Sequence, residues 1–361
     1  MTTALPLEFL APHLHTFAIT LLAALGVSIA VVATNRWHGH LSMDHPGAVQ
    51  KFHETPTPRV GGLGIYLALV LAWYLLPVSE GRQILGQVIT AGLPAFLFGL
   101  AEDLTKRVGV TPRLLATMFS GAVACLISGV ALRQLDVPLM DQMLAFWPVA
   151  LLFTAFAVGG VANAINIIDG FHGLASGTTM LAFAALGVLA LLGGDISLAL
   201  VCWLAAAAVT GFWLVNYPWG KPFLGDGGAY FVGFTLAWMA VLVPMRNPDI
   251  SPWASLMVCA YPFIEVIYSI VRRALQRMSP GQPDSKHLHS LLATQFVQRQ
   301  FKRLPKTLQN AAVAPLLWLY VASLMVLGIV LRESTEWLVA CMIGATLCYH
   351  MVYQALARRK F

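Results

Sequence analysis

Long apolar runs separated by short polar segments dominate this chain. We identify eleven runs that are long enough to cross a bilayer as α-helices, near residues 16–34, 60–79, 83–101, 113–132, 146–166, 173–192, 196–215, 227–245, 252–271, 311–331 and 336–356. Most connections are short, so neighbouring helices should run antiparallel. The pattern predicts an all-α polytopic membrane protein in which residues 1–361 form a single domain.

Composition supports this interpretation. Hydrophobic residues make up 58% of the chain and charged residues only 11%, whereas a soluble domain carries about 25% charged residues. So few charges cannot cover a water-soluble globule. The 5 cysteines all lie in apolar runs and form no CxxC pair, which favours a packing role over disulfides or zinc.

Basic residues are distributed unevenly between the two sets of connections. The segments that follow odd-numbered runs hold 18 of the 22 Lys and Arg residues, and the other set holds 4. Positively charged loops face the cytoplasm, so we expect a periplasmic N-terminus and a cytoplasmic C-terminus. The conspicuous polar clusters also follow odd-numbered runs, and they should therefore meet at the cytoplasmic surface.

Asn163, Asn166 and Asp169 end the fifth run at intervals of three residues. On a helix this spacing places them within an arc of about 120°. Amides and a carboxylate inside a span are costly unless they serve a site, and their oxygen atoms suit a hard cation. Hydrogen bonding between helices is the alternative interpretation.

Residues 216–228 form a segment rich in Pro and Gly before the eighth run, and Asp226 is its only acid. The glycines allow close approach of the backbone to a ligand, which makes Asp226 a candidate metal ligand. Phe223 could stack on a flat base such as uracil, or could simply pack in the membrane.

Glu102 and Asp103 end the third run, shortly before Lys106. Adjacent carboxylates repel and need a nearby cation, either Mg²⁺ or the basic residues that follow. The functional interpretation is a metal or base role for Asp103 and a phosphate contact for Lys106. Ordinary charge at a helix end is the alternative.

Two further basic segments lie on the same predicted face. Lys51 and Arg59 bracket a rigid Pro-Thr-Pro turn that would suit an anionic phosphate. His287 and His289 share a face if their segment is extended, and imidazoles can bind phosphate or donate a hydrogen bond. Glu265 could pair with Arg272 or orient the site, and the sequence does not decide between them.

The order and spacing of these segments resemble the polyprenyl-phosphate N-acetylhexosamine-1-phosphate transferases of glycosyltransferase family 4. The matching segments lie between about residues 45 and 292 and read Lys51-Phe-His-Glu-Thr-Pro-Thr-Pro-Arg59, Glu102-Asp103, Asn163-x-x-Asn166-x-x-Asp169-Gly170, Gly225-Asp226-Gly227-Gly228 and Asp284-x-x-His287-Leu-His289. The Pro-Thr-Pro-Arg and His-x-His variants resemble the bacterial branch that initiates O-antigen and enterobacterial antigen. Glu102, His172 and Ser290 depart from the family pattern, which has Asp, Asp and His at these places.

The resemblance implies transfer of a HexNAc 1-phosphate from a UDP-sugar to undecaprenyl phosphate, with release of UMP, at the cytoplasmic face of the bacterial inner membrane. It implies Mg²⁺, with Mn²⁺ as a substitute, bridging the diphosphate oxygens. The expected partners are the UDP-sugar, undecaprenyl phosphate and membrane lipid, with no nucleic acid, and a homodimer stays open. A secondary transporter of an anionic solute is the alternative, although the polar groups cluster at one surface and no repeated halves are visible.

The resemblance also implies residue roles. Asp226 and Asn166 would bind the metal, with Asp169 nearby as a catalytic residue. Asp103, beside Glu102, would deprotonate or orient the lipid phosphate for direct attack, which we prefer to a covalent aspartyl intermediate although the sequence does not decide. The implied substrate contacts are Lys51, Arg59, Lys106, Asn163, Phe223, His287 and His289.

Overall fold

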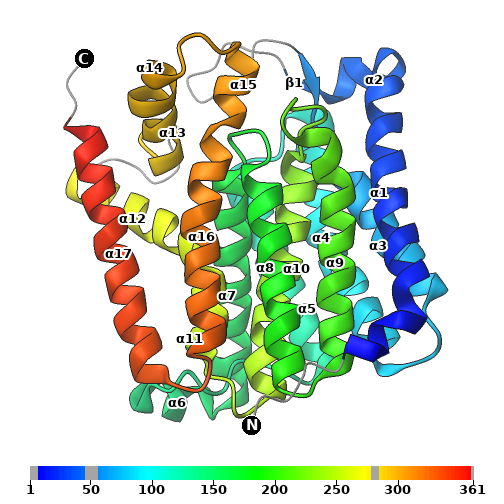
Figure 1. Ribbon diagram of the computed structural model, residues 1–361. Coiled ribbons are helices and arrows are strands. Elements are labelled where there is room, and N and C mark those ends of the chain that lie inside the picture. The colour runs from blue at the N-terminus through cyan, green and yellow to red at the C-terminus, as the bar shows by residue number, and fades with distance from the viewer. Residues whose placement is uncertain (1–6, 45–55, 278–283, 359–361) are drawn as a thin grey trace.

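A bundle of long, roughly parallel helices forms the protein (Figure 1). The computed structural model describes residues 7–44, 56–277 and 284–358. The elements, in chain order, are η1 Leu7–His13, α1 Leu14–Ala33, α2 Asn35–Ser42, β1 Met43–Asp44, β2 Thr57–Pro58, α3 Gly62–Leu75, α4 Glu80–Thr105, α5 Val110–Ser128, α6 Pro138–Leu144, α7 Trp147–Ile168, α8 Leu174–Leu192, α9 Ile196–Asn216, α10 Gly225–Arg246, α11 Pro252–Val258, α12 Ala260–Leu275, α13 Leu288–Leu292, η2 Ala293–Val297, α14 Gln298–Gln300, α15 Lys306–Ala311, α16 Val313–Val330 and α17 Thr335–Ala357.

Helix α10 is the centre of the bundle. Its most apolar window is 89% buried, compared with 28% for the corresponding windows of α1 and α17. It packs against α3, α4, α7 and α8, and two of these contacts use glycine. A Cβ on Gly99 of α4 would lie 2.5 Å from the carbonyl oxygen of Asp226, and Gly62 of α3 lies directly against Gly228. Glycine therefore lets both helices reach the N-terminal turn of α10.

The prediction of an all-α polytopic membrane protein is confirmed in its general form. In the described part of the chain, nine helices are long and apolar enough to cross a membrane, or ten if the bent pair α11–α12 counts as one span. Every predicted run has a helical counterpart, but the predicted number of eleven uninterrupted spans is not confirmed. The run near 60–79 is the 14-residue helix α3, and the run near 252–271 is broken.

Local chemistry explains both differences. Helix α3 ends at Leu75, short of the predicted end at 79, because Leu76 is extended with φ −67° and ψ 138°, as is usual for a residue before a proline, here Pro77. The 80° bend between α11 and α12 follows from Pro262. Proline has no N–H for the carbonyl four residues earlier, at Val258, and its ring clashes with that carbonyl.

Short elements gather at one end of the bundle, where Figure 1 shows α2, β1, α13, α14 and α15. There, β1 and β2 form a two-stranded antiparallel ribbon in which Met43 pairs with Pro58 and Asp44 with Thr57. The C-terminal end of α17 lies at this end and η1 lies at the other. This arrangement agrees with termini on opposite sides of a membrane, while their assignment to periplasm and cytoplasm remains a prediction.

Candidate active site

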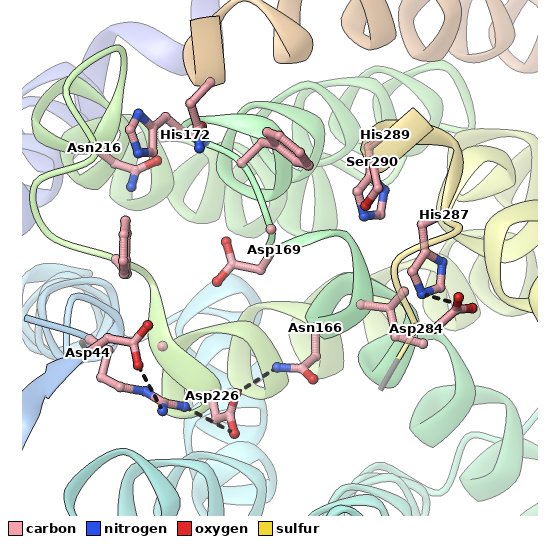
Figure 2. A pocket seen from close by; sticks show the side chains of 17 residues that line it. Asp44, Asn166, Asp169, His172, Asn216, Asp226, Asp284, His287, His289 and Ser290 are labelled. Atoms are coloured by element: carbon pink, nitrogen blue, oxygen red, sulfur yellow. Dashed lines mark hydrogen bonds and ion pairs between the residues drawn. The ribbon is translucent and has the colours of Figure 1, made fainter. Parts of the chain in front are cut away.

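A pocket of about 370 Å³ opens among these short elements (Figure 2). Of the residues predicted to form the site, seven line it: Arg59, Asn166, Asp169, Phe223, Asp226, His287 and His289. They come from four separate stretches of the sequence. The structure therefore brings these seven residues together at one end of the bundle.

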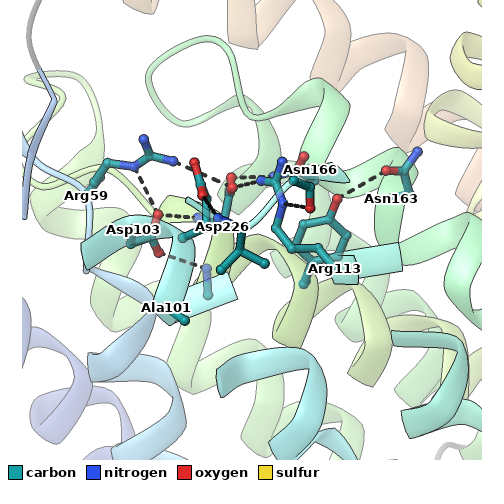
Figure 3. Close-up of polar contacts among 12 residues, drawn as sticks. Arg59, Ala101, Asp103, Arg113, Asn163, Asn166 and Asp226 are labelled. Atoms are coloured by element: carbon teal, nitrogen blue, oxygen red, sulfur yellow. Dashed lines mark hydrogen bonds and ion pairs between the residues drawn. The ribbon is translucent and has the colours of Figure 1, made fainter. Parts of the chain in front are cut away.

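Asp226 starts α10 and lies between two arginines (Figure 3). Its carboxylate pairs with Arg113 and lies 3.6 Å from Nη2 of Arg59. The side-chain amide of Asn166 donates to Oδ1 of Asp226 over 2.9 Å. The preceding residue, Gly225, has a φ of +75°, and a Cβ there would overlap the carbonyl oxygen of Arg59. Only glycine lets the chain turn into α10 so close to the arginine.

Asp103 lies beneath this cluster and is fully buried. Its carboxylate accepts hydrogen bonds from the backbone amides of Asp226 and Gly227, each over 2.9 Å, and from Nε of Arg59 over 2.9 Å. The first amides of a helix have no partner within the helix and carry partial positive charge, so a carboxylate there is stabilising. Asp103 thus connects α4, α10 and Arg59 directly below the pocket.

Of the three polar residues predicted to share one face at the end of α7, two line the pocket and one does not. Asn166 and Asp169 line the pocket, whereas Asn163 accepts a hydrogen bond from the hydroxyl of Tyr230 over 3.2 Å and is not among the lining residues. Within the described part of the chain, the carboxylate of Asp169 forms no ion pair, and Figure 2 shows it directed into the cavity. Burial and the negative charge of Asp103 raise its pKa well above the ordinary value, opposed by Arg59.

The two histidines form the opposite wall. Their rings stack with centroids 5.2 Å apart and an angle of 8° between their planes. Burial lowers the pKa of His289 to about 4, so this ring is neutral at pH 7. Although burial opposes it, hydrogen bonding to Arg272 and to the amide of Lys286 lowers the pKa of the neighbouring Asp284 to about 2.

Phe223 belongs to a loop that is held in place by Asn216, a residue the sequence analysis did not single out. The amide of Asn216 donates to the carbonyl oxygen of Pro222, and its oxygen accepts from the amide of Gly173. His172 lies behind Phe223, with ring centroids 6.1 Å apart, and its Nδ1 is 3.1 Å from the carbonyl oxygen of Pro218. His172 therefore contacts the wall of the pocket at the position where the family pattern has Asp.

Glu102 and Lys106 are also not among the residues that line the described pocket. Glu102 accepts a hydrogen bond from the amide of Val108, and Lys106, at the end of α4, donates to the carbonyl oxygen of Met43. Lys51 lies outside the described residues. The proposed substrate contacts of these residues remain predictions.

Arg113 and Asp44 are functional candidates that sequence reasoning missed. We counted Arg113 only as a positive charge on the cytoplasmic side, yet its guanidinium pairs with Asp226. Asp44 lines the pocket and lies 3.8 Å from Nη1 of Arg59. Neither belongs to a recognisable local motif, and only the packing of distant segments reveals them.

The donor set fits a metal ion that is shared with a substrate. No group of three or more His, Cys, Asp or Glu residues in the described ranges could hold a metal by itself. Asp226, Asp169 and Asn166 nevertheless direct oxygen-bearing groups into one pocket. Mg²⁺ is usually held by one or two carboxylates together with phosphate oxygens, and this arrangement could supply the protein part of such a site.

Comparison with known proteins supports the motif-based assignment. Residues 85–244 match the model of glycosyl transferase family 4. A Yersinia pestis protein named undecaprenyl-phosphate alpha-N-acetylglucosaminyl 1-phosphate transferase is 29% identical over 257 residues, which cover 70% of each chain. The protein of the same name from Escherichia coli K12 is 28% identical, covering 70% of this chain and 69% of its own. A Bacillus subtilis protein named probable undecaprenyl-phosphate N-acetylglucosaminyl 1-phosphate transferase is 26% identical over the same shares of the two chains.

Proposed function

We propose that the chain is a member of glycosyl transferase family 4, whose model residues 85–244 match, and that it transfers a HexNAc 1-phosphate from a UDP-sugar to undecaprenyl phosphate. The observation that carries this proposal is the pocket at one end of the apolar bundle, where Asp169, Asp226 and Asn166 face Arg59 and two histidines. Such a site offers oxygen ligands for a cation and positive groups for phosphates. A lipid substrate could keep its tail among the helices while its phosphate reaches this pocket.

The reaction exchanges one phosphoryl bond for another. An oxygen of the lipid phosphate attacks the phosphorus that carries the sugar. The P–O bond to the uridine-bearing phosphate breaks, and UMP leaves with the bridging oxygen. Since the lipid phosphate is already ionised near neutral pH, the attacking oxygen needs little help from a base, and positioning and charge stabilisation carry most of the catalysis.

Each side chain has a proposed part in this exchange. Asp226, Asn166 and Asp169 would hold Mg²⁺, which when bound neutralises charge on the diphosphate. Arg59 contacts both Asp103 and Asp226 and would bind phosphate oxygens bidentately. Phe223 would stack on the uracil ring.

Asp103 has a more structural part in this scheme. Both of its oxygens already accept hydrogen bonds, so it would orient Arg59 and the N-terminal turn of α10. This role differs from both roles expected for Asp103, which were to deprotonate or to orient the lipid phosphate directly.

One assay tests the proposal directly. The full-length protein is purified and mixed with undecaprenyl phosphate, Mg²⁺ and each member of a panel of UDP-HexNAc donors, and the release of UMP is measured. We expect lipid-dependent UMP release with at least one donor and formation of the lipid-linked diphospho-sugar. UMP release that does not require the lipid, or none with any donor, would contradict the proposal.

A further inference from the structure

A buried carboxylate lies behind the histidine wall and does not itself line the pocket. Glu265 of α12 is 1% exposed. Its Oε1 lies 3.0 Å from Nδ1 of His287 and also accepts the backbone amide of Leu288 over 3.1 Å. A buried carboxylate is costly unless it is paired, so these contacts account for the position of Glu265 and also constrain its partner.

The contact determines which nitrogen of His287 carries a proton. A carboxylate oxygen accepts hydrogen bonds, and therefore Nδ1 of His287 must be the N–H. The other ring nitrogen faces a second carboxylate. Nε2 lies 3.6 Å from Oδ2 of Asp284, a carboxylate that Arg272 and the hydroxyl of Ser269 already hold in place.

His289 also lies close to Glu265. Its Nδ1 lies 3.3 Å from the hydroxyl of Tyr261 and 3.9 Å from Oε2 of Glu265. Its Nε2 lies 3.8 Å from where a Cβ of Gly170, the neighbour of Asp169, would be.

We propose that Glu265 is a positioning residue that fixes the proton on Nδ1 of His287 and the orientation of this ring in the histidine wall. The proposal rests on the proposed function, since it assigns this wall to binding of the UDP-sugar.

Two substitutions of Glu265 distinguish loss of its hydrogen bond to His287 from a change in side-chain packing. Glu265→Gln retains an oxygen that can accept from Nδ1 of His287, whereas Glu265→Leu removes the acceptor at similar volume. Glu333→Gln and Glu333→Leu are matched controls, because Glu333 is exposed at the opposite end of the bundle, where it pairs with Arg332.

The first measurement is the tautomer of His287 in the full-length protein labelled with ¹⁵N-histidine, assigned with His287→Asn. We expect Nδ1–H in the wild type and in Glu265→Gln, and a shift towards Nε2–H in Glu265→Leu. The second is kcat and KM for the UDP-sugar. Carboxylates that orient functional histidines typically contribute about 10- to 100-fold, so kcat/KM should fall by about that factor in Glu265→Leu and largely recover in Glu265→Gln.

The outcomes are distinct from those for the proposed function. An Nε2–H tautomer in the wild type overturns the inference even if Glu265→Leu does not fold. An unchanged tautomer or an unchanged kcat/KM in a folded Glu265→Leu also overturns it, as does an equal loss in Glu265→Gln. Absence of UMP release by the wild type would instead contradict the proposed function, and the tautomer measurement would still decide which nitrogen of His287 carries the proton.

Discussion

At the scale of single residues, three carboxylates in or below the pocket differ in the groups that balance their negative charge. Asp226 has its counterpart in two arginines, and Asp103 in an arginine and two amides. Asp169 instead faces the cavity. These three carboxylates therefore differ in what they can do when a cation or a phosphate arrives.

Asp226 provides the first prediction. Asp226→Asn keeps the side-chain size but removes the charge that would hold Mg²⁺ against the diphosphate. We expect the rate of UMP release to fall about 100-fold or more, as is typical when a group that stabilises developing charge is removed. Binding of Mn²⁺, followed by electron paramagnetic resonance in the presence of the UDP-sugar, should weaken in parallel.

Asp249→Asn is the matched control, since Asp249 is an exposed carboxylate at the opposite end of the bundle. It should leave both measurements unchanged. A normal rate in Asp226→Asn would contradict a metal role for this residue.

Asp169 provides a prediction about pH. Its pKa is raised above the ordinary 3.8 by burial and by Asp103. Between pH 3.8 and the raised pKa, Asp169 is ionised in the unfolded chain but still protonated in the folded protein. The free energy of unfolding therefore decreases as pH rises through this range. Asp169→Asn does not titrate. Without divalent metal, its Tm should exceed that of the wild type by more at pH 8 than at pH 5.

Thermal unfolding in one detergent at both pH values tests this, and the titration of His289 cancels because both proteins contain it. A Tm difference that shrinks as pH rises would show that Asp169 is not destabilised by ionisation.

At the scale of secondary-structure elements, the site depends on how closely α4 and α3 approach the first turn of α10. Asp103 holds that turn from below, and glycines on both neighbouring helices make room for it. The position of the Asp226 carboxylate is thus determined by helix packing as much as by its own loop.

Gly99→Ala tests this dependence. The added Cβ would lie 2.5 Å from the carbonyl oxygen of Asp226, so either α4 or the start of α10 must move. We expect a loss of about 1–3 kcal/mol of stability, as overpacking generally causes, together with a reduced rate of UMP release. Thermal unfolding and the transfer assay measure the two effects.

Gly160→Ala is the control, because Gly160 is also in a long helix but a Cβ there meets nothing within 4 Å. It should be neutral or stabilising by up to about 1 kcal/mol. Equal behaviour of the two variants would contradict a role for the close approach of α4 and α10.

At the scale of the whole molecule, the apolar helices define a membrane-spanning body with the pocket at one end. The excess of basic residues predicts that this end faces the cytoplasm. A nucleotide-sugar made inside the cell would then reach the pocket without crossing the bilayer.

Cysteine labelling tests this orientation. Ser285 is exposed close to the histidine wall, and Gln142 is exposed on α6 at the other end. In intact cells, Gln142→Cys should react with a membrane-impermeant thiol reagent and Ser285→Cys should not, whereas both should react after lysis. The unsubstituted protein controls for native cysteines, of which Cys348 is exposed. The reverse labelling pattern would place the pocket outside.

The sequence by itself determined the membrane class, the approximate helices and the resemblance to glycosyl transferase family 4. Apolar runs of bilayer length can satisfy their backbone hydrogen bonds in lipid only as helices or closed barrels, so their length and apolar character were enough to predict the long helices in outline. The short helices α2, α6, α13, α14 and α15 were not predicted. The sequence also predicted correctly that Asn166, Asp169, Asp226 and His287 meet, because alternating spans bring their ends to one surface.

Only the tertiary structure decided which side chains are partners. Arg113 and Asp226 are far apart in the sequence, as are Glu265 and His287, and their pairing depends on how each helix is rotated and how deeply it is placed. A long apolar run does not determine the rotation or the depth of its helix, because every face of such a helix can pack against a neighbour. The break at Pro262 likewise became visible only as a bend, and it is α12, beyond that break, that carries Glu265 behind the histidines.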